Sequence, residues 1–311
     1  MAKYLVTGGA GFIGSNIVEE LVRRKQKIRV LDSFVTGKRR NLEPFIDRIE
    51  LIKGDIRDRR VCEKACGGMD FVIHQAALRS VPKSVDDPFT TNDVNISGTL
   101  NMLMAAKESA VKRFIYASSS SAYGDAKIFP QKETHAPVPI SPYGVSKLAA
   151  ENYCVTFART FGLETVSLRY FNVFGPRQNP ESKYSAVIPI FIFTMLKGES
   201  PLVEWDGKQS RDFTYVGNVV EANLNACTAK GVSGDVFNVA CGTTTSVIGI
   251  VNSLNKILKT NISPRFAPKR RGDVRKTYAD ISKMKRLLKV KRFVAFEDGL
   301  RRTVEWFMES R

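Results

Sequence analysis

The sequence predicts an α/β protein, with a doubly wound parallel sheet and a smaller, interleaved C-terminal lobe. Three observations support this fold class. Short β-branched runs alternate with helical stretches over the first two-thirds of the 311 residues, which is typical of a parallel sheet with crossover helices. A glycine-rich turn joins the first run to the first helical stretch. Beyond Tyr170 the pattern is broken into loops and short elements by Pro176, Pro180, Pro189, Pro201, Pro264 and Pro268.

The periodicity of apolar residues bounds the elements of the predicted sheet layer. We expect strands near Lys3–Thr7, Lys27–Asp32, Glu50–Lys53, Asp70–His74, Arg113–Ser118 and Thr165–Arg169. Helices are expected over Ile13–Arg24, Ile96–Glu108 and Val145–Thr160. Asp235–Ala240 again has the pattern of a buried strand, so the chain is expected to return to the sheet. The predicted domains are therefore residues 1–170, rejoined by 214–241, and a second lobe over 171–311.

Composition indicates a globular chain without a membrane span. No apolar run approaches the ~18 residues that a transmembrane helix requires, and the stretch before Thr7 is too short for a secretory signal. Five cysteines are scattered, and Cys62 and Cys66 have no second Cys/His pair of matching spacing. We therefore expect reduced thiols, no metal site, no disulfide and a cytoplasmic location.

The chain is strongly basic, with 48 Lys+Arg against 31 Asp+Glu and a formal net charge of +17. Such a charge attracts nucleic acid, anionic membranes or acidic small ligands. The basic residues are spread thinly except at Lys38–Arg40 and Lys269–Arg271, and no zinc-finger or RNA-binding signature accompanies them. The distribution favours a solvated surface or attraction of a diphosphate over nucleic-acid binding, which salt-dependent binding to DNA would reveal.

The glycine-rich turn predicts a Rossmann-type dinucleotide site. Gly8, Gly11 and Gly14 permit a tight turn, a close approach to a pyrophosphate and helix–strand packing. The N-terminus of the following helix would present free N–H groups to the phosphates. The second strand ends at Asp32, whose carboxylate can accept both ribose hydroxyls of NAD and would repel the 2′-phosphate of NADP. Lys38–Arg40 leave NADP open as an alternative, but NAD is favoured.

A candidate catalytic group follows the fifth strand. Tyr143 and Lys147 form a YxxxK pair at the start of a predicted helix, so they share one face. An ammonium beside a phenol favours the phenolate and lowers the tyrosine pKa from ~10. The serine cluster Ser118–Ser121 ends the fifth strand, where a hydroxyl can hydrogen-bond the same substrate oxygen as Tyr143.

Together these motifs resemble the extended short-chain dehydrogenase/reductase family, over essentially the whole chain. Further matching segments are His74–Ala77, Asn95, Arg169–Pro176, Arg211–Phe213 and Arg270–Asp273. Within the family the chain is most similar to the UDP-sugar 4-epimerases, and particularly to the branch that acts on UDP-N-acetylglucosamine. The resemblance implies a UDP-sugar substrate, which the second lobe would bind. It also implies a homodimer through helices around Thr99–Glu108 and Leu148–Thr160.

The same resemblance implies roles for individual residues. Ser119, Tyr143 and Lys147 match catalytic positions. Cofactor contacts are implied at Gly8, Gly11, Phe12, Ile13, Gly14, Asp32, Asp55, Ile56, Arg79, Asn95, Tyr143, Lys147 and Tyr170. Substrate contacts are implied at Ser84, Ser119, Tyr143, Asn172, Ala186, Val187, Trp205, Arg211, Arg270, Asp273 and Thr277. Asp55 is also suitably placed to accept from the adenine amino group, although an ordinary helix cap would explain it too.

The implied reaction is inversion at C4, with NAD retained as a catalyst. Tyr143 would remove the C4 hydroxyl proton as hydride passes to NAD, and the 4-keto sugar would turn before hydride returns. Related dehydratases carry an Asp-Glu pair just after the catalytic serine or threonine, and decarboxylases a Glu. Here Ser120 and Ser121 occupy those places, so epimerisation is favoured.

The identity of the sugar rests on the segments Arg79–Pro88 and Arg177–Pro180, which resemble the branch that acts on UDP-N-acetylglucosamine, and on two small residues. By the resemblance, Thr277 and Ala186 replace a bulky tyrosine and an asparagine of galactose-restricted enzymes, which leaves room for an N-acetyl group at C2 without excluding plain hexoses. Lys183 could attract a C6 carboxylate, so UDP-glucuronate stays open. A non-catalytic NAD-binding sensor is the alternative of a different class, and it would predict the loss of Tyr143 or Lys147.

Overall fold

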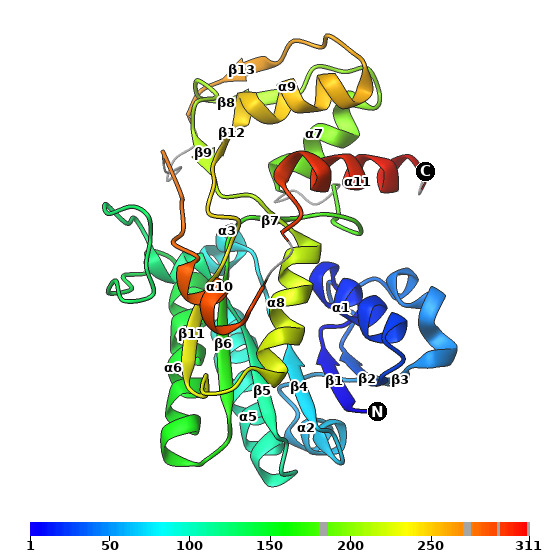
Figure 1. Ribbon diagram of the computed structural model, residues 1–311, viewed down its shortest axis with the longest axis vertical. Helices are drawn as coiled ribbons and strands as arrows, with labels where there is room; N and C mark the ends of the chain where they lie inside the picture. The colour runs from blue at the N-terminus through cyan, green and yellow to red at the C-terminus, as the bar shows by residue number, and fades with distance from the viewer. Residues whose placement is uncertain (181–185, 270–274, 291–292, 310–311) are drawn as a thin grey trace.

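The structure, a computed structural model, describes residues 1–180, 186–269, 275–290 and 293–309. Within them a parallel seven-stranded sheet has the order β11-β6-β5-β4-β1-β2-β3 (Figure 1). The strand order reverses at β1, between β2 and β4, which is where open α/β sheets bind ligands. The strands are β1 (Lys3–Thr7), β2 (Lys27–Asp32), β3 (Glu50–Lys53), β4 (Phe71–His74), β5 (Arg113–Ser119), β6 (Thr165–Tyr170) and β11 (Asp235–Val239).

The predicted fold class and strands are confirmed, with small differences at the strand ends. β4 begins one residue later than expected, β5 and β6 each extend by one residue, and β11 ends one residue earlier. Tyr170 pairs with Ser119 on one side and with Val239 on the other. Pairing between neighbouring strands, rather than residue type, therefore sets these ends.

Helix ends differ for local reasons. α1 spans Phe12–Arg23, one residue earlier than predicted. α6 spans Pro142–Thr160 and begins three residues before the expected Val145, because the Ser141 hydroxyl accepts from the N–H of Gly144 and Pro142 fits the first position. The helix expected from Ile96 is a π-helical turn, η3 (Asp93–Ser97), that continues as α5 (Gly98–Glu108).

Two layers of helices cover the sheet. α1 and α8 (Val216–Thr228) pack on one face, in a core that includes Val6 and Val30. α2 (Arg59–Cys66), α5 and α6 pack on the other face, in a core that includes Leu5 and Leu31. Because alternate residues of a strand point to opposite faces, each buried strand serves both cores.

The second lobe has its own core beyond the carboxyl ends of the strands (Figure 1). This core joins α7 (Val187–Met195), α9 (Val247–Leu258) and α11 (Phe296–Glu309). Residues 214–241 supply α8 and β11 to the sheet layer, and α10 (Ser282–Leu287) also packs on β11.

Short strands and turns complete the described chain. The short strand pairs are β7 (Val173–Phe174) with β10 (Thr214–Tyr215), β8 (Leu202–Glu204) with β13 (Arg265–Ala267), and β9 (Ser210–Arg211) with β12 (Thr245–Ser246). The short helices are α3 (Val81–Asp86), α4 (Pro88–Asn92), η1 (Arg39–Asn41), η2 (Glu43–Arg48) and η4 (Ser120–Tyr123). Of the helices described, none combines the length and apolarity needed to cross a membrane.

Candidate active site

The glycine-rich turn forms a cradle that has no room for side chains. Gly8 has φ +64°, and a Cβ there would lie 2.8 Å from the amide nitrogen of Ala76. A Cβ on Gly14 would lie 2.2 Å from the carbonyl oxygen of Gly8. α1 begins at Phe12 with Gly11 as its N-cap and no side-chain cap, so its first N–H groups are left for a ligand. The turn therefore fits the pyrophosphate of a dinucleotide.

Asp32 lies at the carboxyl end of β2, beside this turn. Its Oδ2 accepts from the N–H of Ala10 at 2.8 Å, and its Oδ1 accepts from the N–H of Phe34 at 2.7 Å. Burial raises the pKa of this carboxyl, and the two backbone N–H groups partly oppose the rise. Each carboxylate oxygen keeps a lone pair, so the fixed group fits a ribose diol.

Asp55, predicted to contact the adenine, forms a salt bridge with Arg57. Its Oδ2 lies 2.8 Å from Nη2 of Arg57, and hydrogen bonding to Arg57 is the main cause that lowers its pKa. The N-cap of α2 is Asp58, so the alternative interpretation of Asp55 as a helix cap was wrong. Ile56 is buried, and a Cβ on Gly98 would lie 2.7 Å from its Cδ1.

Tyr143, Lys147 and Ser119 come together where α6 begins and β5 ends. Nζ of Lys147 donates to the carbonyl of Ala117 at 2.8 Å, which ties α6 to β5. Ser119 Oγ accepts from the N–H of Ser121 at 3.1 Å, and hydrogen bonding between Ser119 and Tyr143 stabilises the phenolate. A phenol, a hydroxyl and an amine thus share one site, as the sequence predicted.

The direction of the tyrosine pKa differs from the expectation. Burial raises the pKa of Tyr143, while its hydrogen bond with Ser119 and the charge of Arg79 partly oppose the rise. Burial also lowers the pKa of Lys147 to about 7. The expected lowering of the tyrosine pKa by Lys147 was therefore wrong for this structure, because burial is the largest cause of the shift and the groups that oppose it are Ser119 and Arg79 rather than Lys147.

Two residues predicted as ligand contacts, Ser84 and Asn95, also bind protein groups. Ser84 is fully buried, accepts from the N–H of Tyr143 at 3.0 Å and donates to the carbonyl of Val81 at 2.6 Å. Asn95 accepts from the N–H of Leu78 at 2.8 Å and donates to Ser146 Oγ at 3.0 Å. Both side chains hold the first turn of α6 against neighbouring segments. That Ser84 also contacts the substrate stays a prediction.

Two further predicted cofactor residues flank this centre. The Tyr170 hydroxyl interacts with Nε2 of Gln75 at 2.9 Å and with Nδ2 of Asn223 at 2.8 Å, and its ring is buried. Arg79 is exposed in the segment after β4. The predicted contacts Phe12 and Ile13 are half-buried at the start of α1.

Several predicted substrate residues line one cavity of about 270 Å³ in the second lobe. Asn172, Ala186, Val187 and Arg211 are among its lining residues. Asn172 Nδ2 also donates to Thr277 Oγ1 at 3.0 Å, so Thr277 lies directly behind this wall. Arg270 and Asp273, like Lys183, lie outside the described residues.

Trp205, predicted to contact the substrate, lies beside Lys269 and Arg275. It is not among the residues that line this cavity. Its ring has Nζ of Lys269 at 4.2 Å and Cζ of Arg275 at 4.5 Å from the centroid. The ring is therefore engaged in cation–π contacts of the protein itself.

Sequence reasoning missed Gln209 in the same cavity. Its side chain is buried, and Nε2 donates to the carbonyl of Glu204 at 2.7 Å. Oε1 meets no donor among the residues the structure describes, although buried acceptors are usually paired. The wall of the cavity therefore contains one buried acceptor that the described residues leave unpaired. A buried glutamine between short strands leaves no periodic pattern that would reveal it.

The sheet, the glycine cradle and Asp32 define a dinucleotide-binding α/β protein with a second, ligand-sized cavity. Residues 4–240 match the model of the NAD dependent epimerase/dehydratase family. The chain belongs to that family, and its cofactor is NAD.

Individual relatives differ in the reaction that their names give. The chain is 40% identical to a putative UDP-glucose 4-epimerase of Methanocaldococcus jannaschii, over 98% of each chain. It is 32% identical to a UDP-N-acetyl-alpha-D-glucosaminuronate decarboxylase of Bacillus cytotoxicus, over 99% of this chain and 98% of the other. The structure of a UDP-N-acetylglucosamine 4-epimerase from Methanobrevibacter ruminantium, in complex with UDP-N-acetylmuramic acid, is similar with a TM-score of 0.94. It is 39% identical and matches 100% of this chain and 99% of the other.

Proposed function

We propose that the protein is a UDP-sugar 4-epimerase that acts through a transient 4-keto sugar. The observation that carries this proposal is the meeting of Tyr143, Lys147 and Ser119 at one end of the sheet. In this proposal the sheet domain, residues 1–170 with 214–241, binds NAD, and the lobe 171–311 binds the UDP-sugar.

The residues of the site divide the reaction among them. When bound, NAD supplies a hydride acceptor and then a hydride donor. Tyr143 takes the proton of the C4 hydroxyl and later returns it, while Ser119 hydrogen-bonds the same oxygen. Arg211, from the wall of the cavity, suits the diphosphate. A firm hold on UDP leaves the keto sugar free to turn over.

Decarboxylation is the second candidate, because one relative is named a decarboxylase. That chemistry calls for a carboxylate after the catalytic serine, whereas this chain has Ser120 and Ser121 in η4. The test is incubation with UDP-GlcNAc, UDP-Glc and UDP-glucuronate, with products separated by C4 stereochemistry. Epimers support the proposal, while a pentose or a 4-keto-6-deoxy product would replace it with decarboxylation or dehydration.

The substrates proposed are UDP-GlcNAc/UDP-GalNAc together with UDP-Glc/UDP-Gal. Ala186 and Thr277 are both small, at and behind the cavity wall, which leaves space beside C2. Names of similar proteins support both sugar classes. UDP-glucuronate is the remaining candidate, on the basis of Lys183 alone.

Discrimination between NAD and NADP should depend on Asp32. We expect the parent protein to bind NAD more tightly than NADP, because the fixed carboxylate repels a 2′-phosphate. Asp32→Ala combined with Ser33→Arg should reverse or abolish this preference, measured as the ratio of the two dissociation constants. Ser33→Arg alone is the control. Tighter NADP binding by the parent would contradict the assignment.

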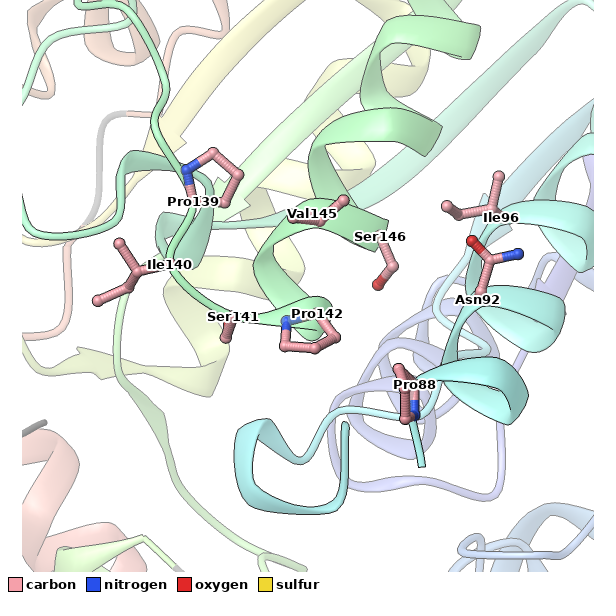
Figure 2. Close-up of a pocket in the computed structure, with 9 residues that line it drawn as sticks. All are labelled: Pro88, Asn92, Ile96, Pro139, Ile140, Ser141, Pro142, Val145 and Ser146. Atoms are coloured by element: carbon pink, nitrogen blue, oxygen red, sulfur yellow. The ribbon is translucent and has the colours of Figure 1, made fainter. Parts of the chain in front are cut away.

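A second copy of the chain is proposed to cover an apolar hollow at the start of α6. Figure 2 shows Pro88, Asn92 and Ile96 facing the segment 139–146 across this hollow. Its volume is about 450 Å³. Beside it Phe89 is 87% exposed, so one face carries both a projecting ring and a hollow, as a two-fold contact requires. The expected contact thus includes the N-terminal ends of α4 and α6, beyond the helices named from the sequence.

Phe89→Asp should convert the proposed dimer to a monomer, because a carboxylate cannot be buried in an apolar contact without cost. Sedimentation or light scattering measures the mass of the particle. Met308→Asp, at an exposed apolar residue of α11, is the matched control and should leave the dimer intact. A monomeric parent would rule out this arrangement.

A further inference from the structure

A buried ion pair lies directly behind the candidate catalytic residues. Glu151 is one turn beyond Lys147 on α6, and Arg169 is the penultimate residue of β6. Arg169 Nη2 lies 2.6 Å from Oε1 of Glu151, and Arg169 Nε donates to Oε2 at 2.9 Å. The Glu151 side chain is 2% exposed and the Arg169 side chain is 4% exposed. Two parallel hydrogen bonds of this kind fix both distance and orientation.

The pair also contacts the strand that carries the serine cluster. Ser118 Oγ donates to Oε2 of Glu151 at 2.6 Å, and Ser118 directly precedes Ser119. The guanidinium of Arg169 lies 4.5 Å from the centroid of Tyr123, at the end of η4. The pair therefore joins α6, β5, β6 and η4, which are the elements that surround the site.

Stability alone does not account for this arrangement. Transfer of two charges out of water costs about as much as their attraction returns, so a hydrophobic pair of similar size would serve as well. Nη1 of Arg169 is buried and meets no acceptor among the described residues, and an unmet donor adds to the cost. The ion pair does supply a defined geometry. Apolar side chains would not, because their contacts are not directional.

We propose that Glu151 and Arg169 are positioning residues, which hold Ser119 on β5 at the correct distance and angle from Tyr143 and Lys147 on α6. This inference rests on the proposed function, because it assigns the ion pair to the same reaction. Misplacement of reacting groups by about 1 Å costs up to about 10²-fold in rate. UDP binding should be unaffected, since the cavity of the second lobe lies on other elements.

The chain offers a matched control at the opposite end of the same strand. Arg113 begins β5, and its Nη2 lies 2.6 Å from Oε2 of Glu164, just before β6. This pair also joins β5 to the start of β6, but it is far along the strand from Ser119. Glu164→Gln therefore tests what loss of a strand-joining ion pair does to stability without touching the site.

The experiment compares Glu151→Gln, Arg169→Lys and Glu164→Gln with the parent. Glu151→Gln removes the charge, and Arg169→Lys keeps the charge but loses the planar fork. For both we expect kcat to fall by roughly ten- to a hundredfold, with KM and UDP affinity within about twofold. Glu164→Gln should lower the melting temperature less, because Glu164 is 49% exposed, and it should leave kcat unchanged. Ser118→Ala, a milder change that keeps the ion pair, should lower kcat several-fold with KM unchanged.

Hydride transfer from the UDP-sugar to bound NAD, followed by the absorbance of reduced nicotinamide, separates the two proposals. Parent protein that transfers hydride but forms no epimer overturns the proposed function and still allows the positioning test. Unchanged hydride transfer in Glu151→Gln and Ser118→Ala, or an equal loss in Glu164→Gln, overturns the positioning role. Parent protein without hydride transfer overturns both.

Discussion

Replacement of Tyr143 by phenylalanine is expected to lower kcat for epimerisation by at least about 10²-fold, the usual scale for removal of a general base. The ring remains, so α6 and its contacts with β5 should be preserved. Only the group that takes the C4 proton is lost, and UDP-sugar affinity should stay close to that of the parent. Steady-state kinetics and UDP binding by calorimetry measure the two quantities separately.

The pH dependence of the parent provides a second test of the same residue. Burial raises the pKa of Tyr143, so the fraction of phenolate, and with it kcat, should increase as the pH rises towards that pKa. The residual activity of Tyr143→Phe should lack this rise. Ser119→Ala is the matched control, with a smaller loss because a neighbouring hydroxyl or water can replace it. Parental turnover by Tyr143→Phe would place the base elsewhere.

The parts of the site that the sequence predicted are those encoded by local rules. The glycine turn and Asp32 lie at the ends of β1 and β2, and the YxxxK pair lies at the start of α6. A glycine where a Cβ would meet backbone and a carboxylate at a strand end are visible within a few residues. β1 and β2, which carry the glycine turn and Asp32, are neighbours in the sheet, so the fold and the dinucleotide site could be derived together.

The parts that the sequence did not predict depend on contacts between distant segments. Ser84 was predicted as a substrate contact, and the sequence did not reveal that its side chain also binds the backbone of Tyr143, 59 residues away. In the sequence, Glu151 is an ordinary residue of a predicted helix and Arg169 belongs to the segment Arg169–Pro176. Only the packing of α6 on β6 reveals that the two side chains pair. The predicted direction of the shift in the Tyr143 pKa was wrong. Burial, which a sequence does not display, is the largest cause of the shift and raises this pKa.

Replacement of Thr277 by tyrosine is expected to separate the two proposed sugar pairs. Thr277 Oγ1 accepts from Nδ2 of Asn172 at 3.0 Å, directly behind the cavity wall. A tyrosine would fill the space proposed for the acetyl group, and overpacking costs about 1–3 kcal/mol, or roughly ten- to two-hundredfold in rate. The loss should fall on kcat for UDP-GlcNAc/UDP-GalNAc, while UDP-Glc/UDP-Gal turnover is largely spared.

A matched control separates added volume from the lost hydroxyl. Thr277→Val keeps the size of the side chain but removes the acceptor for Asn172, so it should affect both sugar pairs alike and only modestly. Because UDP supplies most of the hold in either case, KM should change little in both variants. An equal loss for both sugar pairs in Thr277→Tyr would mean that residue 277 supports the fold of the second lobe. Parent protein inactive on acetylated sugars would refute the substrate assignment and leave C4 epimerisation of plain hexoses intact.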